Sequence, residues 1–418
     1  MSDRTKKILL IVVFILAVLL FAFGLYYLFF RPLFAPPAPP VVIPTPAPIT
    51  GLPVLPPALN IAVPPASPLP VVIPPGIPGA PAASPAGPTY SYQATGGITA
   101  FQTLENESSQ NPTLATNGQD LIYYNKNKGS FYRLTPDGQK TSFSDAIFKN
   151  VQKITWSNNT QKAILEYPDG SNIVYDFNQK RSLTLPAQWK DFTFSPDSQK
   201  IAFKDMKLDP ENRYLAVANA DGTNYREIER LGDKDADVYV TWSPTDTYGA
   251  LYRAPLDGDR SEVYPIGFNG ENFKKFTIEG RDPRFNWSPN GNKLLYSVYN
   301  SSSDFNPTLW VINMRPELIG TGRNKFEIKT WADKCTFASE STVYCAVPET
   351  LETGTGFLPN LADNTPDNFY KIDLQKGTQE LIAQPLFPTT VDKMIVSEDA
   401  KTLYWLEKNS AQLKEMKL

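Results

Sequence analysis

The sequence predicts an all-β fold, a seven-bladed β-propeller, preceded by one transmembrane helix and a proline-rich stalk. Three observations lead to this prediction: an apolar run near the N-terminus, a long uncharged segment dense in proline, and a hairpin unit that recurs through the rest of the 418 residues. We therefore divide the chain into a cytoplasmic tail (1–7), a transmembrane helix (8–30), a proline-rich extended linker (31–96) and a propeller (97–418).

The apolar run extends from Ile8 to Phe30 and is 23 residues long. As a helix it would be about 35 Å long, enough to cross a hydrocarbon core of about 30 Å. Three basic residues precede it, and after Arg31 the next basic residue is Lys126. By the positive-inside rule, this signal anchor leaves the N-terminus in the cytoplasm and the propeller outside the cell membrane. A cleaved signal peptide is the alternative, but its apolar region should be only about 7–15 residues long.

The stalk follows directly and holds 21 of the 39 prolines between Pro32 and Pro88. No charged residue occurs from Pro32 to Leu104. Proline fixes φ and removes backbone donors, so this composition favours polyproline II over helix or sheet. Fully extended, 57 such residues would span about 175 Å. A spacer across the cell envelope is the expected role, and a ligand for a proline-binding module is the alternative.

From residue 97 onward, one unit recurs: an apolar stretch that ends in an aromatic residue, a Ser-Pro-Asp-like turn, and a second apolar stretch. Alternating β-branched and aromatic residues around such a turn are typical of a β-hairpin. A second strand pair follows each hairpin, which makes four strands in about 40–50 residues, the size of a propeller blade. Seven copies place the turn serine or its equivalent at positions 115, 157, 195, 243, 288, 338 and 397.

The last copy supplies only three strands, at 393–397, 402–407 and about 412–417. We expect residues 97–104 to add the missing outer strand and so close the ring without an open sheet edge. Six blades would follow if one weak copy were misread. The aromatic residues that end the first strands are expected to pack between blades; they are Trp156, Phe194, Trp242, Trp287 and Phe337.

The turns resemble those of the WD40-like, or PD40, repeat of the TolB-like propeller family. The resemblance rests on Ser195-Pro196-Asp197, Ser243-Pro244 and Ser288-Pro289-Asn290-Gly291. It covers residues 97–418 and is degenerate in three copies. The Gly-His and Trp-Asp dipeptides of true WD40 repeats are absent. The resemblance implies a propeller that binds a protein, peptide or glycan on one face.

Composition excludes several functional classes. The chain has no histidine, which excludes Ser-His-Asp and Cys-His catalysis and histidine-ligated zinc or haem. Residues 32–418 carry 36 basic and 42 acidic groups, and nucleic-acid binding needs a basic surface. We therefore expect no enzyme, no cofactor and no nucleic-acid partner. Asp233, Asp235 and Asp237 imitate the start of a calcium loop but lack its glycine and its final glutamate, so no metal is expected.

The only two cysteines, Cys335 and Cys345, lie symmetrically about Glu340 at the turn of one hairpin. They should therefore face each other across two antiparallel strands, within disulfide range. Location outside the cytoplasm would favour their oxidation. Two buried free thiols are the alternative.

Charged residues near the starts of first strands, and in the loops that join second and third strands, are expected to share one face. This candidate ligand face comprises Asp191, Asp257, Asp259, Arg281, Asp282, Arg284, Asp333, Lys334 and Asp392. The insertion Pro348–Asp367 should lie there too, since loops of about 20 residues are often functional. The sequence thus indicates a membrane-anchored binding scaffold outside the cytoplasm. The alternatives are a structural subunit of an envelope assembly and, third, a glycan-active enzyme that uses paired carboxylates.

Overall fold

The computed structural model describes residues 14–21, 23 and 90–418, and the chain forms two compact units, Met1–Pro81 and Ala82–Leu418. In the first unit, residues 14–21 and 23 are helical and exposed. The rest of the expected transmembrane helix (8–30), and the linker as far as residue 89, lie outside the described residues. Within the described part of the chain, no helix is both long enough and apolar enough to cross a membrane.

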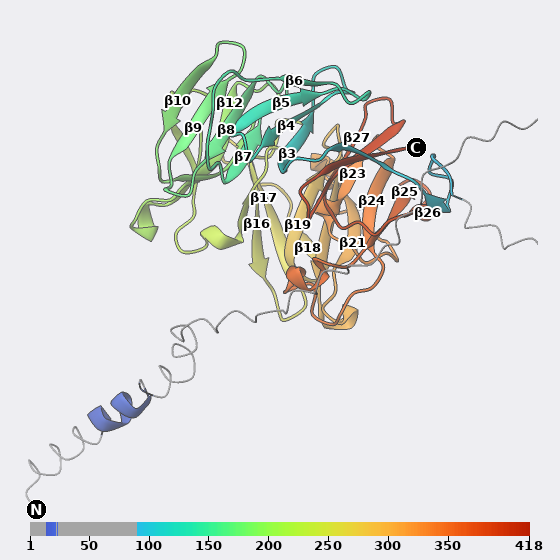
Figure 1. Cartoon of the computed structure of the whole chain (residues 1–418). Coiled ribbons are helices and arrows are strands. Elements are labelled where there is room, and N and C mark those ends of the chain that lie inside the picture. The colour runs from blue at the N-terminus through green and yellow to red at the C-terminus, as the bar shows by residue number, and fades with distance from the viewer. Residues whose placement is uncertain (1–13, 22, 24–89) are drawn as a thin grey trace, which may run out of the picture. The chain divides into compact units, whose positions relative to one another are not determined.

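The second unit is a ring of seven sheets, so the predicted seven-bladed propeller is confirmed and the six-bladed alternative is wrong. The colour in Figure 1 follows the blades around the ring in chain order. Blades 1 to 5 are each a four-stranded antiparallel meander of consecutive strands. First strands of neighbouring blades contact each other, for example β3 with β7 and β7 with β11, so the first strands line the centre of the ring.

The strands of blades 1 to 3 are β3 (Ser109–Leu114), β4 (Leu121–Asn125), β5 (Ser130–Leu134), β6 (Lys140–Ser142), β7 (Lys153–Trp156), β8 (Lys162–Glu166), β9 (Asn172–Asp176), β10 (Arg181–Leu185), β11 (Trp189–Phe194), β12 (Lys200–Asp205), β13 (Tyr214–Asn219) and β14 (Arg226–Arg230). Those of blades 4 and 5 are β15 (Val238–Val240), β16 (Ala250–Pro255), β17 (Ser261–Ile266), β18 (Phe276–Ile278), β19 (Arg281–Trp287), β20 (Lys293–Tyr299), β21 (Thr308–Asn313) and β22 (Asn324–Lys325).

Blade 6 consists of β23 (Cys335–Phe337), β24 (Thr342–Pro348), β25 (Asp367–Asp373), β26 (Thr378–Pro385) and the added strand β1 (Ile98–Thr99). Blade 7 consists of β27 (Val391–Val396), β28 (Thr402–Glu407), β29 (Leu413–Lys417) and β2 (Gln102–Glu105). Short 3-10 helices lie in the connections: η3 (Pro210–Asn212), η4 (Asp235–Asp237), η5 (Ser301–Ser303), η6 (Pro316–Leu318), η7 (Ala332–Lys334) and η8 (Pro359–Ala362).

The ring closes as predicted in blade 7, but the N-terminal segment is shared between two blades. Strand β2 pairs antiparallel with β29, where Gln102 lies opposite Glu415. The expectation of one strand over residues 97–104 is corrected for Ile98–Thr99, which pair parallel with the outer strand of blade 6. Contacts with the propeller also begin before residue 97, since Gln93 forms a bridge with Lys417.

The recurring serine holds the turn between first and second strands. In five of the seven copies its buried hydroxyl accepts the backbone N–H five residues later; in blade 5, Ser288 Oγ accepts from Lys293 N at 3.0 Å. The same bond occurs at Ser157, Ser195, Ser243 and Ser397. In blades 1 and 6 an alanine stands there, and the backbone bonds of the turn remain. The repeat therefore encodes a turn that its own serine and backbone hold in shape.

Apolar clusters fill the spaces between blades. Phe194 and Trp242 are buried, and Trp156, Trp287 and Phe337 are half-buried against neighbouring clusters, so the predicted packing role of these rings is confirmed. In blade 6, Cys335 and Cys345 occupy opposite positions of β23 and β24 and are joined by a disulfide.

Candidate functional site

Two faces of the ring can be distinguished from strand direction. Because strands within a blade alternate in direction, the segments that enter first strands and the loops from second to third strands share one edge, which we call the upper face. The opposite edge, the lower face, carries the turns from first to second and from third to fourth strands. All nine predicted ligand-face residues lie on segments of the upper face.

A local distortion sets the direction of several of these side chains. The first strands of blades 1, 3, 5 and 7 each contain a register shift near their start. At the bulges of blades 1, 3 and 5, Asn111, Asp191 and Asp282 adopt positive φ values of 46°, 56° and 43°. Asp392 lies at the bulge of blade 7. A bulge re-aims the side chain that it carries and is common next to functional sites.

Blades 4 to 6 bring six of the predicted residues into one region of the upper face. Asp282 accepts a hydrogen bond from the Tyr299 hydroxyl and lies 3.5 Å from Nη1 of Arg253. Burial and this hydrogen bond raise the pKa of Tyr299, which therefore acts as a donor. Arg284 Nη1 lies 2.6 Å from Asp333 Oδ2.

The same region includes the loop between β16 and β17. Asp259 accepts hydrogen bonds from the backbone N–H and hydroxyl of Ser301, and these bonds lower the pKa of its carboxyl. Arg281 Nη2 lies 3.5 Å from Asp259 Oδ1. Asp257 instead pairs within its own loop, at 2.7 Å from Arg260. The contacts of Asp259 with Ser301 and Arg281 therefore connect blade 4 to blade 5.

A pocket of about 180 Å³ opens among these residues. Its walls include Asp282 and Arg284 beside Tyr299, Trp331 and Phe357, and its remaining lining is Ser297, Val298, Pro307, Gly356 and Pro359. The guanidinium of Arg284 lies 5.4 Å from the centre of the Trp331 ring, within cation–π range. The pocket thus combines an aromatic interior with charges at its rim.

The predicted long insertion forms one wall of this pocket. Between β24 and β25, its backbone bonds to blade 5, where Gly356 N donates to Phe305 O at 2.7 Å. The Phe357 ring packs at 5.2 Å from Tyr299 and 5.1 Å from Phe305. On the other side, Lys408 of blade 7 lies 2.5 Å from Asp363. The insertion is therefore tied to both neighbouring blades.

Lys334 is placed differently from the other predicted residues. Its Nζ lies 2.6 Å from both carboxylate oxygens of Asp367, and both side chains are buried. Asp367 also accepts the backbone N–H of Val391 from blade 7. Burial lowers the pKa of Lys334 and raises that of Asp367. The pair lies within blade 6, Asp367 links it to blade 7 through Val391, and its burial closes it to a ligand.

Asp191 belongs to a second group, in blades 2 and 3. It lies 2.8 Å from Nζ of Lys204 and 3.5 Å from that of Lys153, which also lies 3.5 Å from Glu166. Burial acts to raise the pKa of Asp191, but the two lysines hold it below its ordinary value. Burial raises the pKa of Glu166. A cavity of about 360 Å³ adjoins Asp191, whereas Asp392 is exposed and makes no ion pair in the described part of the chain.

The calcium-like acidic run does not converge. Asp235 lies 2.9 Å from Arg213, and Asp237 lies 2.5 Å from Arg253, so each is paired with a different arginine. Among residues 14–21, 23 and 90–418, no group of three or more acidic or cysteine side chains is arranged to hold a metal ion.

Sequence reasoning identified the charged rim of the pocket and missed its aromatic walls, Tyr299, Trp331 and Phe357. Phe357 lies within the predicted insertion, and Trp331 stands two residues before Asp333, so both were near a predicted feature. Tyr299 ends an ordinary second strand, and no sequence signal distinguishes it from the other strand tyrosines. Only the approach of blade 6 to blade 5 gives it this role.

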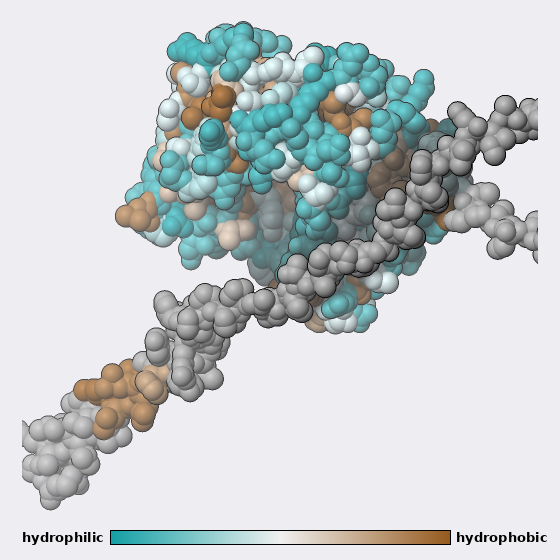
Figure 2. All heavy atoms as spheres, in the orientation of Figure 1, coloured by the Kyte–Doolittle hydropathy of each residue, from teal (hydrophilic) through white to brown (hydrophobic). Residues whose placement is uncertain are grey.

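Exposed apolar side chains are concentrated on the upper face. Of the nine large ones between residues 106 and 418, all described, two are on the lower face, Tyr225 and Leu318. The other seven are on the upper face: Ile147, Leu208, Leu256, Phe357, Leu358, Leu361 and Phe387. Figure 2 shows an otherwise mainly hydrophilic propeller surface with hydrophobic side chains in small, separate groups. Three of the seven come from the insertion beside the pocket.

Comparison with known proteins gives the fold alone. No family model and no curated protein matches the sequence. Among solved structures, the chain is similar to the β-propeller domain of Cps50 (Swd1) from Myceliophteria thermophila, with a TM-score of 0.52 and 11% identity over 76% of this chain and 99% of that one.

Two further similar structures have TM-scores of 0.49. One is an oligogalacturonate lyase in complex with manganese, at 13% identity over 75% of this chain and 90% of that one. The other is the tricorn protease, at 9% identity over 76% of this chain and 34% of that one.

Proposed function

We propose that the propeller is a binding scaffold that recognises a protein partner on its upper face, at the pocket between blades 5 and 6. The observation that carries the proposal is the concentration of exposed apolar side chains on the upper-face loops, with Phe357, Leu358 and Leu361 beside the pocket. Exposed apolar groups rimmed by polar residues are typical of protein interaction sites. The lower face has no comparable group within the described propeller.

The size and lining of the pocket favour a protein over a glycan. A cavity of about 180 Å³ accepts one side chain of a partner and little more. Tyr299 and Trp331 are only 5% and 6% exposed, so their ring faces are not available as a platform for a sugar. A partner side chain that enters such a pocket becomes buried inside a charged rim, and side chains buried in this way are the usual core of protein interfaces.

The proposal includes an N-terminal membrane anchor at residues 8–30, with the propeller outside the cytoplasm. The support is the apolar run with its preceding basic residues, and the Cys335–Cys345 disulfide, which would persist in an oxidising compartment. Deletion of residues 1–30 should release the protein from carbonate-washed membranes. Retention of the deleted form in the membrane pellet would refute the anchor.

We further propose that the propeller is a divergent member of the TolB-like group and has no enzymatic activity. The support for the family is the Ser-Pro-Asp or Ser-Pro-Asn turn in blades 3 and 5. The support for a non-catalytic role is the absence of histidine from the sequence and the engagement of the pocket carboxylates: Asp282 with Arg253 and Tyr299, and Asp333 with Arg284.

Site-specific photocrosslinking in intact cells tests the binding face. A benzophenone amino acid is placed at Phe357 on the upper face and, as a matched exposed apolar control, at Leu318 on the lower face. We expect one defined partner to crosslink from position 357 only. Leu358→Asp should reduce this product about ten-fold, because it adds a charge to the apolar group, and Leu318→Asp should not. Equal products from both positions, or a product that persists in Leu358→Asp, would refute the proposal.

A further inference from the structure

We propose that a second site, the groove between blades 2 and 3 toward the lower face, binds an acidic peptide segment. The groove has a volume of about 370 Å³ and does not involve any residue of the upper-face pocket. Its size is within the range of ligand sites. The charged groups of the groove divide into carboxylates that are bonded within their own turns and cations that have no partner in the described part of the chain.

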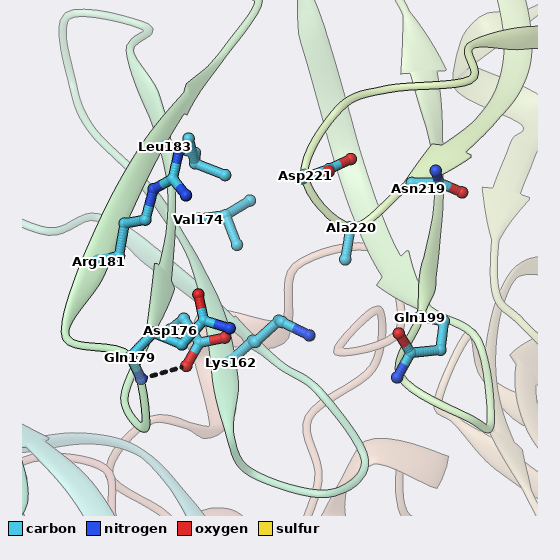
Figure 3. A pocket seen from close by; sticks show the side chains of 10 residues that line it. All are labelled: Lys162, Val174, Asp176, Gln179, Arg181, Leu183, Gln199, Asn219, Ala220 and Asp221. Atoms are coloured by element: carbon cyan, nitrogen blue, oxygen red, sulfur yellow. Dashed lines mark hydrogen bonds between the residues drawn. The ribbon is translucent and has the colours of Figure 1, made fainter.

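Figure 3 shows the two walls of the groove facing each other. Blade 2 contributes Lys162, Asp176, Gln179 and Arg181, and blade 3 contributes Gln199, Asn219 and Asp221. Apolar side chains lie between these polar groups: Val174, Leu183 and Ala220. Val174 and Ala220 are only 3% and 5% exposed, so the groove has a closed apolar floor.

The carboxylates of the groove are occupied by their own turns. Asp176 accepts the backbone N–H groups of Asn178 and Gln179 at 3.0 and 2.8 Å. Asp221 accepts the N–H and hydroxyl of Thr223 at 3.0 and 2.6 Å. The Thr223 bonds lower the pKa of Asp221, with a smaller contribution from the charge of Lys162. Both carboxylates thus stabilise tight turns.

The cations of the groove have no such partners. Within the described residues, neither the ammonium of Lys162 nor the guanidinium of Arg181 makes a hydrogen bond or an ion pair. The adjacent blade shows the alternative: Arg226, which begins β14 as Arg181 begins β10, donates to the carbonyl of Phe268 at 2.7 Å. Two unpaired cations beside an apolar floor are complementary to a ligand that carries carboxylates.

The other lining groups favour a peptide among carboxylate ligands. Asn219 Nδ2 donates to Thr223 Oγ1, and Gln199 Nε2 donates to Asp197 O. Because an amide has two N–H groups and an acceptor oxygen, these side chains and Gln179 can still donate to and accept from a peptide backbone. The floor at Val174 and Ala220 fits an aliphatic side chain. No aromatic ring lines the groove, so it lacks a stacking surface for a sugar ring. An extended segment that alternates acidic and aliphatic residues satisfies all three features.

The test uses the full-length chain in detergent and the fluorescent peptide Glu-Val-Glu-Val, acetylated and amidated, with binding followed by anisotropy. The double variant Lys162→Gln, Arg181→Gln removes the two free cations. Lys162 is half-buried and Arg181 is exposed. The control, Lys293→Gln, Lys376→Gln, removes the same net charge at corresponding lower-face turns of blades 5 and 6. Thermal unfolding of each variant verifies that it is folded.

We expect the groove variant to bind the peptide about ten-fold more weakly and the control to bind it as the parent does. Parent affinity should fall when salt rises from about 0.05 M to about 0.3 M, because exposed charges are screened. An equal loss in the control, or no binding to the folded parent, overturns the proposal. So does tighter binding of an oligouronate of equal charge, which would assign the groove to acidic saccharides.

Discussion

The lower and upper faces of this propeller are built from the same strands and differ in how their connections are held. On the lower face, five turns repeat one arrangement, in which a buried serine hydroxyl accepts the N–H five residues later. On the upper face, the loops from second to third strands range from the short 126–129 of blade 1 to the long 349–366 of blade 6. Ion pairs there connect neighbouring blades, as between Lys408 and Asp363. The serine bond holds each lower turn locally, and neighbouring lower turns also contact each other, as where Asn159 N donates to Ser198 Oγ. Within the described propeller, the upper loops have no such repeated bond and differ in length and side chains.

The comparison also shows that the upper face has two parts. One part is structural and buried, as in the Lys334–Asp367 pair of blade 6, which bonds to blade 7 through Val391 N. The other part is exposed and apolar, as in Phe357. Predicted charged residues fall in both parts, so charge and position in the repeat do not by themselves indicate a ligand contact.

The largest effect is expected for Asp367→Asn. The substitution leaves the buried ammonium of Lys334 without its counter-charge, which should lower the free energy of unfolding by about 3–5 kcal/mol. Because burial lowers the pKa of Lys334, the unfolded chain binds more protons at this lysine. The stability of the variant should therefore rise as the pH rises toward the ordinary pKa of lysine, about 10.4. Urea unfolding across this range measures both effects.

The matched control is Asp257→Asn, in which the exposed partner Arg260 stays solvated. Its effect should be below about 1 kcal/mol. If both variants lose the same stability, the upper face has no buried structural part.

An intermediate effect is expected for Ser288→Ala on the lower face. Removing the hydroxyl leaves the backbone N–H of Lys293 without this acceptor and should cost about 1–3 kcal/mol. The exposed Ser302 of the upper face provides the control, since Ser302→Ala should change stability by less than about 0.5 kcal/mol. Equal costs would show that the lower-face turns are not held by their serines. Chemical unfolding with a common baseline compares the two.

The smallest effect on stability is expected for Phe357→Ala. The ring is 47% exposed and packs on Tyr299 and Phe305, so its loss should cost about 1 kcal/mol. Phe203→Ala, at a fully buried ring, should cost about 3–5 kcal/mol. Differential scanning calorimetry distinguishes the two. A cost at Phe357 as large as at Phe203 would mean that the insertion serves the core and not a partner.

Much of the fold was predictable because its information is local. The Ser195-Pro196-Asp197 turn marks a hairpin regardless of its neighbours, and its spacing to the next copies indicates the blades. The opposition of Cys335 and Cys345 followed from their symmetry about one turn. The split of the N-terminal segment was not predictable, since the parallel pairing of Ile98 with Gln384 depends on how blade 6 ends beside blade 7.

The candidate site was predictable only in part. Placement on the upper face followed from strand direction, which the repeat determines. The contacts between side chains did not follow from strand direction. The sequence predicts an exposed Lys334 next to Asp333, yet Lys334 is buried because it pairs with Asp367, 33 residues later on another strand. The free cations Lys162 and Arg181 are likewise defined by what fails to approach them in space.

The sequence by itself therefore determined the blade number, the closing strand of blade 7, the disulfide partners and the face on which the charged loops lie, because each depends on strand alternation and short-range turns. Only the tertiary structure decided which charges are buried, which aromatic rings form the pocket, and which cations remain unpaired. These properties depend on distances between blades, and no pattern within one blade specifies its distance to the next.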